Sequence, residues 1–432
     1  MRRIFAFLLF CVMCLPAPGA TLINDTETER LLNELVAPLA TASDISPERL
    51  QVHIVADNDF NAFVRGGEDV YVYTGLLQQI KTPDALQAVI AHELGHTIGG
   101  HMAQLSARQD AEMKRTMLIQ ALGIGLMAVG GDASLGAGVL AGSGGIATQS
   151  MLSFSRDEER IADNLGIDLM IRAGLNPNGF ITVFEQMAQM TEPMENRINP
   201  NRINHPLTRE RLKNAREYIA KNAPKVLGKD NSDYNTRYEL VRAKLIGYLD
   251  TPKNVLIRYP WVDKSDSALY ARAIANMRGG DLETARTGTL TLINRHPQNA
   301  YFYELLGDIE FQFGHYDDSI DAYEKSLSLT SNAPQIETAL AVVLTERRRP
   351  DDIPRAIELA KRSILTQPTP LAYWTLARAY GEEQTGLHSW AMAEYYAMQG
   401  DEKQMKKYAK IARRKLPKNT PEYIKSGDLL EK

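Results

Sequence analysis

His92-Glu93-Leu94-Gly95-His96 is the stretch that decides the fold of the first half of this 432-residue chain. Thr82 can cap a helix that leads into this stretch, and Pro83 suits the first helical position. On such a helix His92 and His96 project from one face, at a separation that suits a single Zn²⁺. Glu93 lies beside them and can act as a base on water without being a ligand. The stretch therefore predicts a helical zinc site of the metalloprotease type.

Zinc needs a third protein ligand, and His101 is the first residue to consider. It follows His92 by nine residues, which turns it about 180° around the same helix. An unbroken helix therefore points His101 away from the metal, although Gly99-Gly100 could break the helix. This geometry favours a structural role for His101.

A second predicted helix, at about residues 156–173, offers better ligands. Glu159 and Asp163 are four residues apart and share a face of that helix. Glu159 can complete a His₂Glu site, and Asp163 can orient a ligand imidazole. Glu158 is a rival for the metal. Acidic residues at the N-terminus of a helix also interact favourably with the helix dipole, and they need not bind a metal to do so.

The segments before the zinc helix predict a small sheet beside helices. The leucines of residues 21–50 have helical spacing, whereas residues 51–56 and 69–74 are strand-like. We expect the strand at 69–74 to present an edge that pairs with an extended substrate, so that cleavage depends on an unfolded backbone.

Several short pieces of residues 28–215 carry a resemblance to a known family. They are Asn61-Ala62-Phe63, Gly66-Gly67, Thr74-Gly75-Leu76, the zinc helix, and Ser155-Arg156 followed by Glu159, Ala162 and Asp163. The chain here resembles the M48 family of zinc peptidases. The resemblance implies a zincin-like α+β protease domain, and it implies that Glu159 rather than Glu158 is the third zinc ligand.

Asn204-His205-Pro206, with Arg211 six residues after the histidine, also resembles a family motif that lines the active site. We expect His205 or Arg211 to stabilise the oxyanion. His205 has two other possible roles. It could be a loop residue without a function, or a fourth ligand that closes the metal site and keeps the enzyme latent.

The composition changes after residue 225, where a polar linker precedes a near-periodic helical array at 235–425. Gly280 and Gly314 are 34 residues apart, which is the tetratricopeptide period. The array predicts an α-solenoid of tetratricopeptide-like repeats that binds protein partners; a generic all-α domain is the alternative. The fold class is thus mainly α with a small β-sheet in a first domain, residues 21–225, followed by the solenoid.

The first twenty residues have the pattern of a signal peptide. Arg2-Arg3 precede an apolar run at 4–15, and small residues at 16–20 predict cleavage near residue 19 or 20. A retained membrane anchor is the alternative. The only two cysteines, Cys11 and Cys14, fall in this segment, which excludes a disulfide framework from the mature chain. We expect export to the periplasm.

Residues 117–154 are rich in Gly, Ala, Leu and Met. They predict a mobile lid or a membrane-surface element that gives a peripheral membrane contact, or a buried hairpin of core helices. The net charge of −4 gives no indication of nucleic-acid binding.

The resemblance implies a function as well. We expect a periplasmic endopeptidase with one Zn²⁺ per chain that hydrolyses unfolded or misassembled proteins, in outer-membrane protein quality control. The alternative is a chaperone or adaptor whose repeat domain binds the outer-membrane assembly machinery, with a mostly latent protease.

Overall fold

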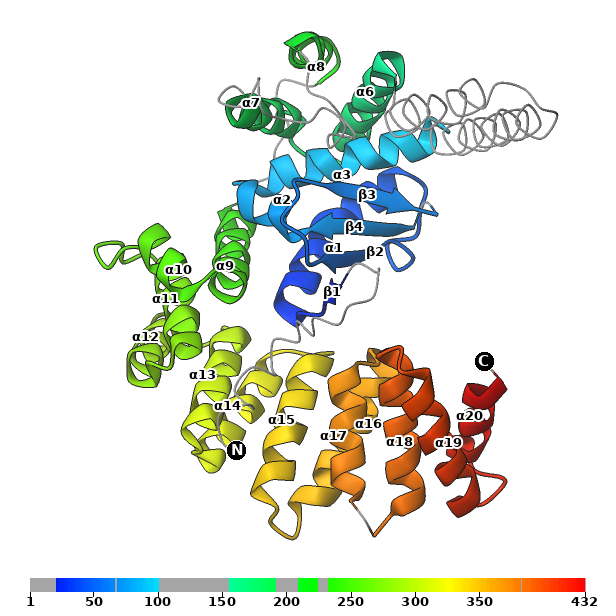
Figure 1. The fold of residues 1–432 in the computed structure, drawn as a ribbon. Helices are drawn as coiled ribbons and strands as arrows, with labels where there is room; N and C mark the ends of the chain where they lie inside the picture. Colours follow the sequence, from blue (N-terminus) through cyan, green and yellow to red (C-terminus); the bar gives the residue numbers. More distant parts are fainter. Residues whose placement is uncertain are drawn as a thin grey trace, which may run out of the picture. The chain divides into compact units, whose positions relative to one another are not determined.

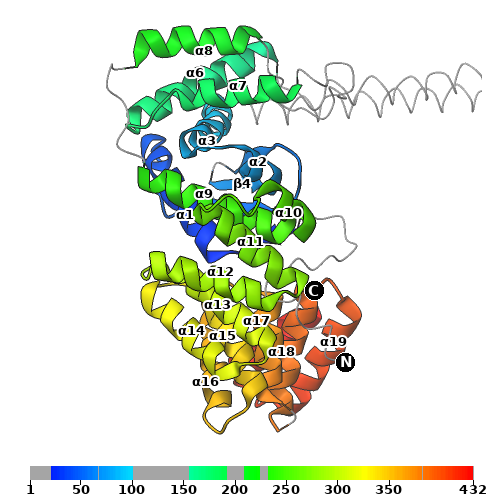
Figure 2. The same cartoon turned by 90° about the vertical axis from the view of Figure 1, so that its left-hand side faces the viewer.

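The computed structural model describes residues 21–66, 68–100, 155–191, 209–223, 232–381 and 383–431. The chain forms two compact units (Figures 1 and 2). We call Leu31–Tyr238 the sheet unit, and Met1–Arg30 with Glu239–Lys432 the repeat unit. The predicted signal peptide, the segment 117–154 and most of the predicted linker lie outside the described residues, so these interpretations stay predictions, as do the domain boundaries.

Three short strands of the sheet unit lie in the order β2-β4-β3. Strand β4 is parallel to β2, with Gln51 opposite Asp69, and antiparallel to β3, with Ala62 opposite Val72. The expectation that the strand at 69–74 presents an edge is therefore wrong. The turn at Gly66 folds β3 back onto one side of β4, and β2 takes the other side. The strands are β1 (Leu22–Ile23), β2 (Gln51–Val55), β3 (Ala62–Arg65) and β4 (Asp69–Tyr73).

Helix α3 is the central helix of the sheet unit. It packs against β3, α6 and α7, and α8 covers α6 and α7 (Figure 1). As predicted, Thr82 caps α3 by accepting a hydrogen bond from the backbone of Ala85, with Pro83 next to it. The helices are α1 (Thr26–Ala42), α2 (Thr74–Gln79), α3 (Pro83–Ile98), α6 (Arg156–Arg172), α7 (Gly179–Thr191) and α8 (Arg209–Asn222); α1 also extends into the repeat unit.

Two glycines allow α3 and α6 to approach each other closely. A Cβ atom on Gly95 would lie 2.5 Å from the carbonyl oxygen of Ala162. One on Gly166 would lie 2.9 Å from the backbone of Ala91. Because real Cβ atoms do not come this near to backbone, the close contact requires glycine at both positions.

The repeat unit consists of successive helices packed in pairs, which confirms the predicted tetratricopeptide-like fold class (Figure 2). Gly280 and Gly314 end α11 and α13 in the left-handed conformation, with φ of 86° and 83°. The helices are α9 (Ser232–Leu249, which begins in the sheet unit), α10 (Pro252–Arg258), α11 (Asp266–Gly279), α12 (Leu282–Arg295), α13 (Ala300–Phe313), α14 (Tyr316–Leu329), α15 (Pro334–Arg347), α16 (Asp352–Thr366), α17 (Pro370–Tyr380), α18 (Thr385–Met398), α19 (Glu402–Lys415) and α20 (Pro421–Glu431).

The N-terminal segment Asn24–Arg30 packs onto the repeat helices, which the sequence did not predict. The ammonium of Lys244, in α9, lies 2.6 Å from Asp25 and 3.3 Å from Glu27, and all three side chains are buried. The hydroxyl of Tyr270 donates to Glu27 at 2.9 Å. The repeat unit therefore incorporates a segment distant from it in sequence.

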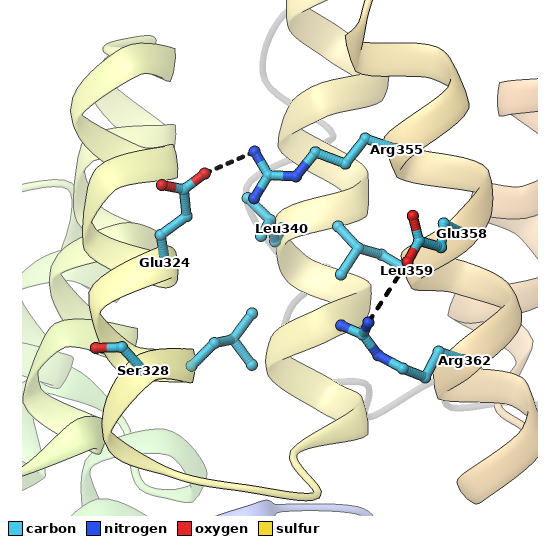
Figure 3. Close-up of a pocket in the computed structure, with 8 residues that line it drawn as sticks. Glu324, Ser328, Leu340, Arg355, Glu358, Leu359 and Arg362 are labelled. Carbon is cyan, nitrogen blue, oxygen red and sulfur yellow. Dashed lines mark ion pairs between the residues drawn. The ribbon is translucent and has the colours of Figure 1, made fainter.

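A pocket of about 450 Å³ opens between α14, α15 and α16 (Figure 3). Leu327, Leu340 and Leu359 supply its apolar lining. The charges at its rim are paired with each other, since Arg355 lies 2.6 Å from Glu324. Among the described residues no helix combines the length and the apolar character that crossing a membrane requires.

Candidate metal centre

His92, His96 and Glu159 bring three ligand atoms within 4.8 Å of one another. The two Nε2 atoms of the histidines are 3.1 Å apart, and each lies 3.5 Å from a carboxylate oxygen of Glu159. All three residues are buried, with at most 7% of each exposed. His92 and His96 lie one turn apart on α3, and the packing of α6 against α3 brings Glu159 to them.

Asp163 holds the first of these histidines. Its Oδ1 lies 2.9 Å from Nδ1 of His92, the ring nitrogen remote from the other two ligands. A carboxylate at this distance favours the proton on Nδ1, and the Nε2 lone pair is then available to a cation. Glu159 and Asp163 are one turn apart on α6, so a single helix places both the ligand and the residue that orients its neighbour.

Arg211, from α8, binds both carboxylates of α6. Its Nε and Nη2 donate to Asp163 at 2.9 and 2.8 Å, and its Nη1 lies 2.6 Å from Glu159. The guanidinium also lies over the ring of Phe184, 5.0 Å from its centroid. A guanidinium engaged with two carboxylates fixes them in place. The oxyanion role of Arg211 stays a prediction.

The charges around Asp163 determine its ionisation. Burial alone would raise the pKa of this carboxyl, but hydrogen bonds from His92 and Arg211 outweigh burial and hold the pKa below its usual range. Burial would likewise lower the pKa of Arg211, yet Asp163, Glu159 and Glu93 raise it. Asp163 and Arg211 therefore stay charged at neutral pH.

Glu158 is engaged elsewhere, at the start of α6. Its carboxylate accepts a hydrogen bond from the backbone of Ser155 at 2.8 Å, and the Ser155 side chain accepts one from the backbone of Glu158. This reciprocal pair is a capping box, which satisfies backbone donors at the helix N-terminus. The geometry thus favours Glu159 over Glu158 as the ligand.

Glu93 is buried on α3, next in sequence to the first ligand, and its charge interacts with Arg211. His101 and His205 lie outside the described residues, so their predicted roles stay predictions. The sequence did not reveal Phe184 as part of the site. Its only signal is an apolar position on a helix, which does not distinguish a site residue from a core residue.

The donor set suits zinc. Two imidazole nitrogens and one carboxylate oxygen are the protein ligands of one common class of catalytic zinc site, which keeps a position open for water. Two Nε2 atoms that face each other at 3.1 Å cannot both be acceptors without a shared cation or proton between them. The residues present therefore fit a bound divalent metal.

Taken together, a small sheet, a helix with two histidines one turn apart, and a glutamate from a following helix that lies beside them are the features of a metallopeptidase. Residues 26–219 match peptidase family M48, so the chain carries a domain of that family. This finding confirms the resemblance inferred from the motifs.

Comparisons with individual proteins agree with the domain match. The chain is 26% identical to the β-barrel assembly-enhancing protease of Escherichia coli strain K12, over 77% of this chain and 68% of that protein. The protein of the same name from Yersinia pestis is 23% identical, over 83% of this chain and 73% of its own length. The mitochondrial metalloendopeptidase OMA1 of Schizosaccharomyces pombe is 30% identical, over 44% and 51%.

Proposed function

We propose that this protein is a periplasmic zinc endopeptidase that hydrolyses unfolded or misassembled proteins in outer-membrane protein quality control. The observation that carries the proposal is the convergence of His92, His96 and Glu159 on one buried point. The names of the relatives from Escherichia coli and Yersinia pestis, with matches that extend beyond the peptidase domain, support the link to β-barrel assembly.

The chemistry is shared between the metal and the protein. His92, His96 and Glu159 would hold a zinc ion, which would supply the Lewis acid that polarises the scissile carbonyl and acidifies water. Glu93 takes a proton from the attacking water and delivers it to the leaving amine. Asp163 keeps the His92 ring in one orientation, and Arg211 keeps Glu159 and Asp163 in place. Arg211 is thus a positioning residue in this mechanism.

The outer edge of β3 is the proposed site for the substrate backbone. This strand borders α3, and no described strand pairs with its outer edge. An extended peptide that adds to the edge is recognised mainly through its main chain. The enzyme would therefore select unfolded segments rather than a particular sequence.

The repeat unit favours a second activity, binding of assembly partners as a chaperone or adaptor. Paired helices that form an extended array are a common scaffold for protein recognition. In this alternative the protease is latent for most of the time, and His205 as a fourth ligand would provide the restraint. His205→Ala would then keep its metal and cleave casein faster.

The decisive experiment compares the wild type with Glu93→Gln. We expect the variant to retain one metal ion per chain and the wild-type melting temperature, because Glu93 is not a ligand. Its rate of casein cleavage should fall by about 10²–10⁴, the usual contribution of a general base. Metal content by mass spectrometry and cleavage with and without a chelator are the measurements.

A variant that cleaves casein at nearly the wild-type rate would exclude this mechanism. Loss of metal in Glu93→Gln would instead make Glu93 a ligand. If the wild type binds metal and never cleaves, even after His205→Ala, the chaperone or adaptor function is favoured.

A further inference from the structure

An exposed apolar turn lies between α10 and α11, in the repeat unit. The backbone N–H of Asp263 donates to the carbonyl of Pro260 at 2.9 Å, so Trp261 and Val262 form the tip of the turn. Trp261 is 54% exposed and Val262 82% exposed. Ile257, near the end of α10, is 68% exposed. Three large apolar side chains thus reach solvent within six residues.

A buried arginine holds this turn in place. Arg272, in α11, is 2% exposed, and its Nη1 donates to the carbonyl oxygens of Tyr259 and Pro260 at 3.3 and 2.9 Å. Its guanidinium carbon lies 5.2 Å from the centroid of the Trp261 ring. Among the described residues its Nε and Nη2 have no hydrogen-bond partner. Two buried donors without partners cost free energy. The other contacts of Arg272 keep the apolar tip rigid and exposed.

Two lysines are near the turn in sequence, one on each side of it. Lys253 and Lys264 are exposed and form no ion pair with any described residue. Asp266 binds Arg295 and His296, whereas Asp263 accepts a hydrogen bond from the backbone of Ser265 and keeps its negative charge. The segment around the turn therefore carries two exposed lysines without ion-pair partners and one carboxylate.

We propose that this turn, which we call the Trp261 turn, inserts into the surface of an anionic lipid bilayer. Tryptophan favours the membrane–water interface, and exposed lysines near an inserted segment attract anionic headgroups. A stable protein interface usually involves about 20–30 residues on each side, many more than this tip provides. A few apolar side chains suffice for shallow insertion into a membrane.

The test is flotation of the full-length protein with vesicles of phosphatidylcholine alone and of phosphatidylcholine with phosphatidylglycerol at 3:1. We expect the wild type to float with the anionic vesicles. The double variant Trp261→Ser with Val262→Ser should lose at least about tenfold in partition coefficient. Lys253→Gln and Lys264→Gln should each lose about fivefold, and only with anionic vesicles.

The control is Leu365→Ser, which removes an 86% exposed leucine from α16 and should leave flotation unchanged. Casein cleavage and melting temperature should stay at wild-type values in the turn variant. Casein cleavage therefore tests the proposed peptidase function, and flotation tests the membrane proposal independently of it. A wild type that does not float, or a turn variant that floats equally well, would overturn the proposal. Loss of a self-association in the turn variant, without vesicle binding, would assign the turn to a second copy of the chain.

Discussion

At the scale of single residues, two adjacent glutamates have different tasks. Glu159 points at the histidines, whereas Glu158 caps α6. We expect Glu159→Ala to lose metal affinity by more than tenfold, because only two protein ligands remain. Glu158→Ala should keep its metal and lose about 1 kcal/mol of stability, as for other caps. Titration with zinc and denaturant unfolding of both variants are the measurements. The opposite pattern would move the ligand to Glu158.

The sequence predicted the residues of this site unequally well. His92 and His96 belong to one helix, so their spacing alone brings them together. Glu159 required the family resemblance to separate it from Glu158. The partners of Arg211 could not be predicted, because the contact with Asp163 joins residues 48 apart and depends on how three helices pack.

At the scale of elements, the distance between α3 and α6 determines the site. A Cβ on Gly95 would meet the backbone of Ala162, which cannot move as a side chain can. We expect Gly95→Ala to force the helices apart, to cost about 1–3 kcal/mol of stability as overpacking does, and to weaken zinc binding. Calorimetry and zinc titration are the measurements.

Gly288→Ala is the matched control, since its Cβ would meet the Cβ of Ala273 at an ordinary 3.6 Å. That variant should keep its zinc affinity and gain up to about 1 kcal/mol from helix propensity. Equal zinc affinities for Gly95→Ala and wild type would contradict the argument from close packing.

The repeats show why periodicity was only partly visible in the sequence. Arg348 follows Gly314 by the same 34 residues and ends α15 with φ of 56°, in the same left-handed conformation. An arginine there gives no signal in the sequence, because this conformation is expected of glycine. The next helix of this kind, α17, ends at Gly381, one residue out of phase. The backbone conformation therefore repeats after 34 residues even where the residue type does not.

At the scale of the whole molecule, the buried charges around Lys244 make stability depend on pH. Burial raises the pKa of Glu304 to about 8 and that of Asp308 to about 6, although Lys244 opposes both shifts. Burial also raises the pKa of Glu27. Asp25, on the N-terminal segment, also acts on this cluster, as do Tyr248, Tyr270 and Tyr323, on α9, α11 and α14.

The sign follows from proton binding. Between about pH 4.5 and pH 8 the folded state binds more protons at Glu304 than the unfolded state does, so the free energy of unfolding falls as pH rises. The raised pKa of Lys244 acts only above its ordinary value of 10.5. We expect the free energy of unfolding of Glu304→Gln to decrease less between pH 5 and pH 8 than that of the wild type. Denaturant unfolding at several pH values tests this, and an equal decrease in both proteins would contradict it.

The docking of the N-terminal segment also affects the order of folding. Thr26 binds Gln335, Arg30 binds Thr330, and Gln367 binds Asn24, so these contacts close loops of 309, 300 and 343 residues. Helical repeats otherwise fold through local contacts and quickly, whereas contacts of such sequence separation form late. Residues 24–30 therefore precede the repeat helices in the chain but are among the last to reach their native partners, because these contacts require the chain as far as Gln367.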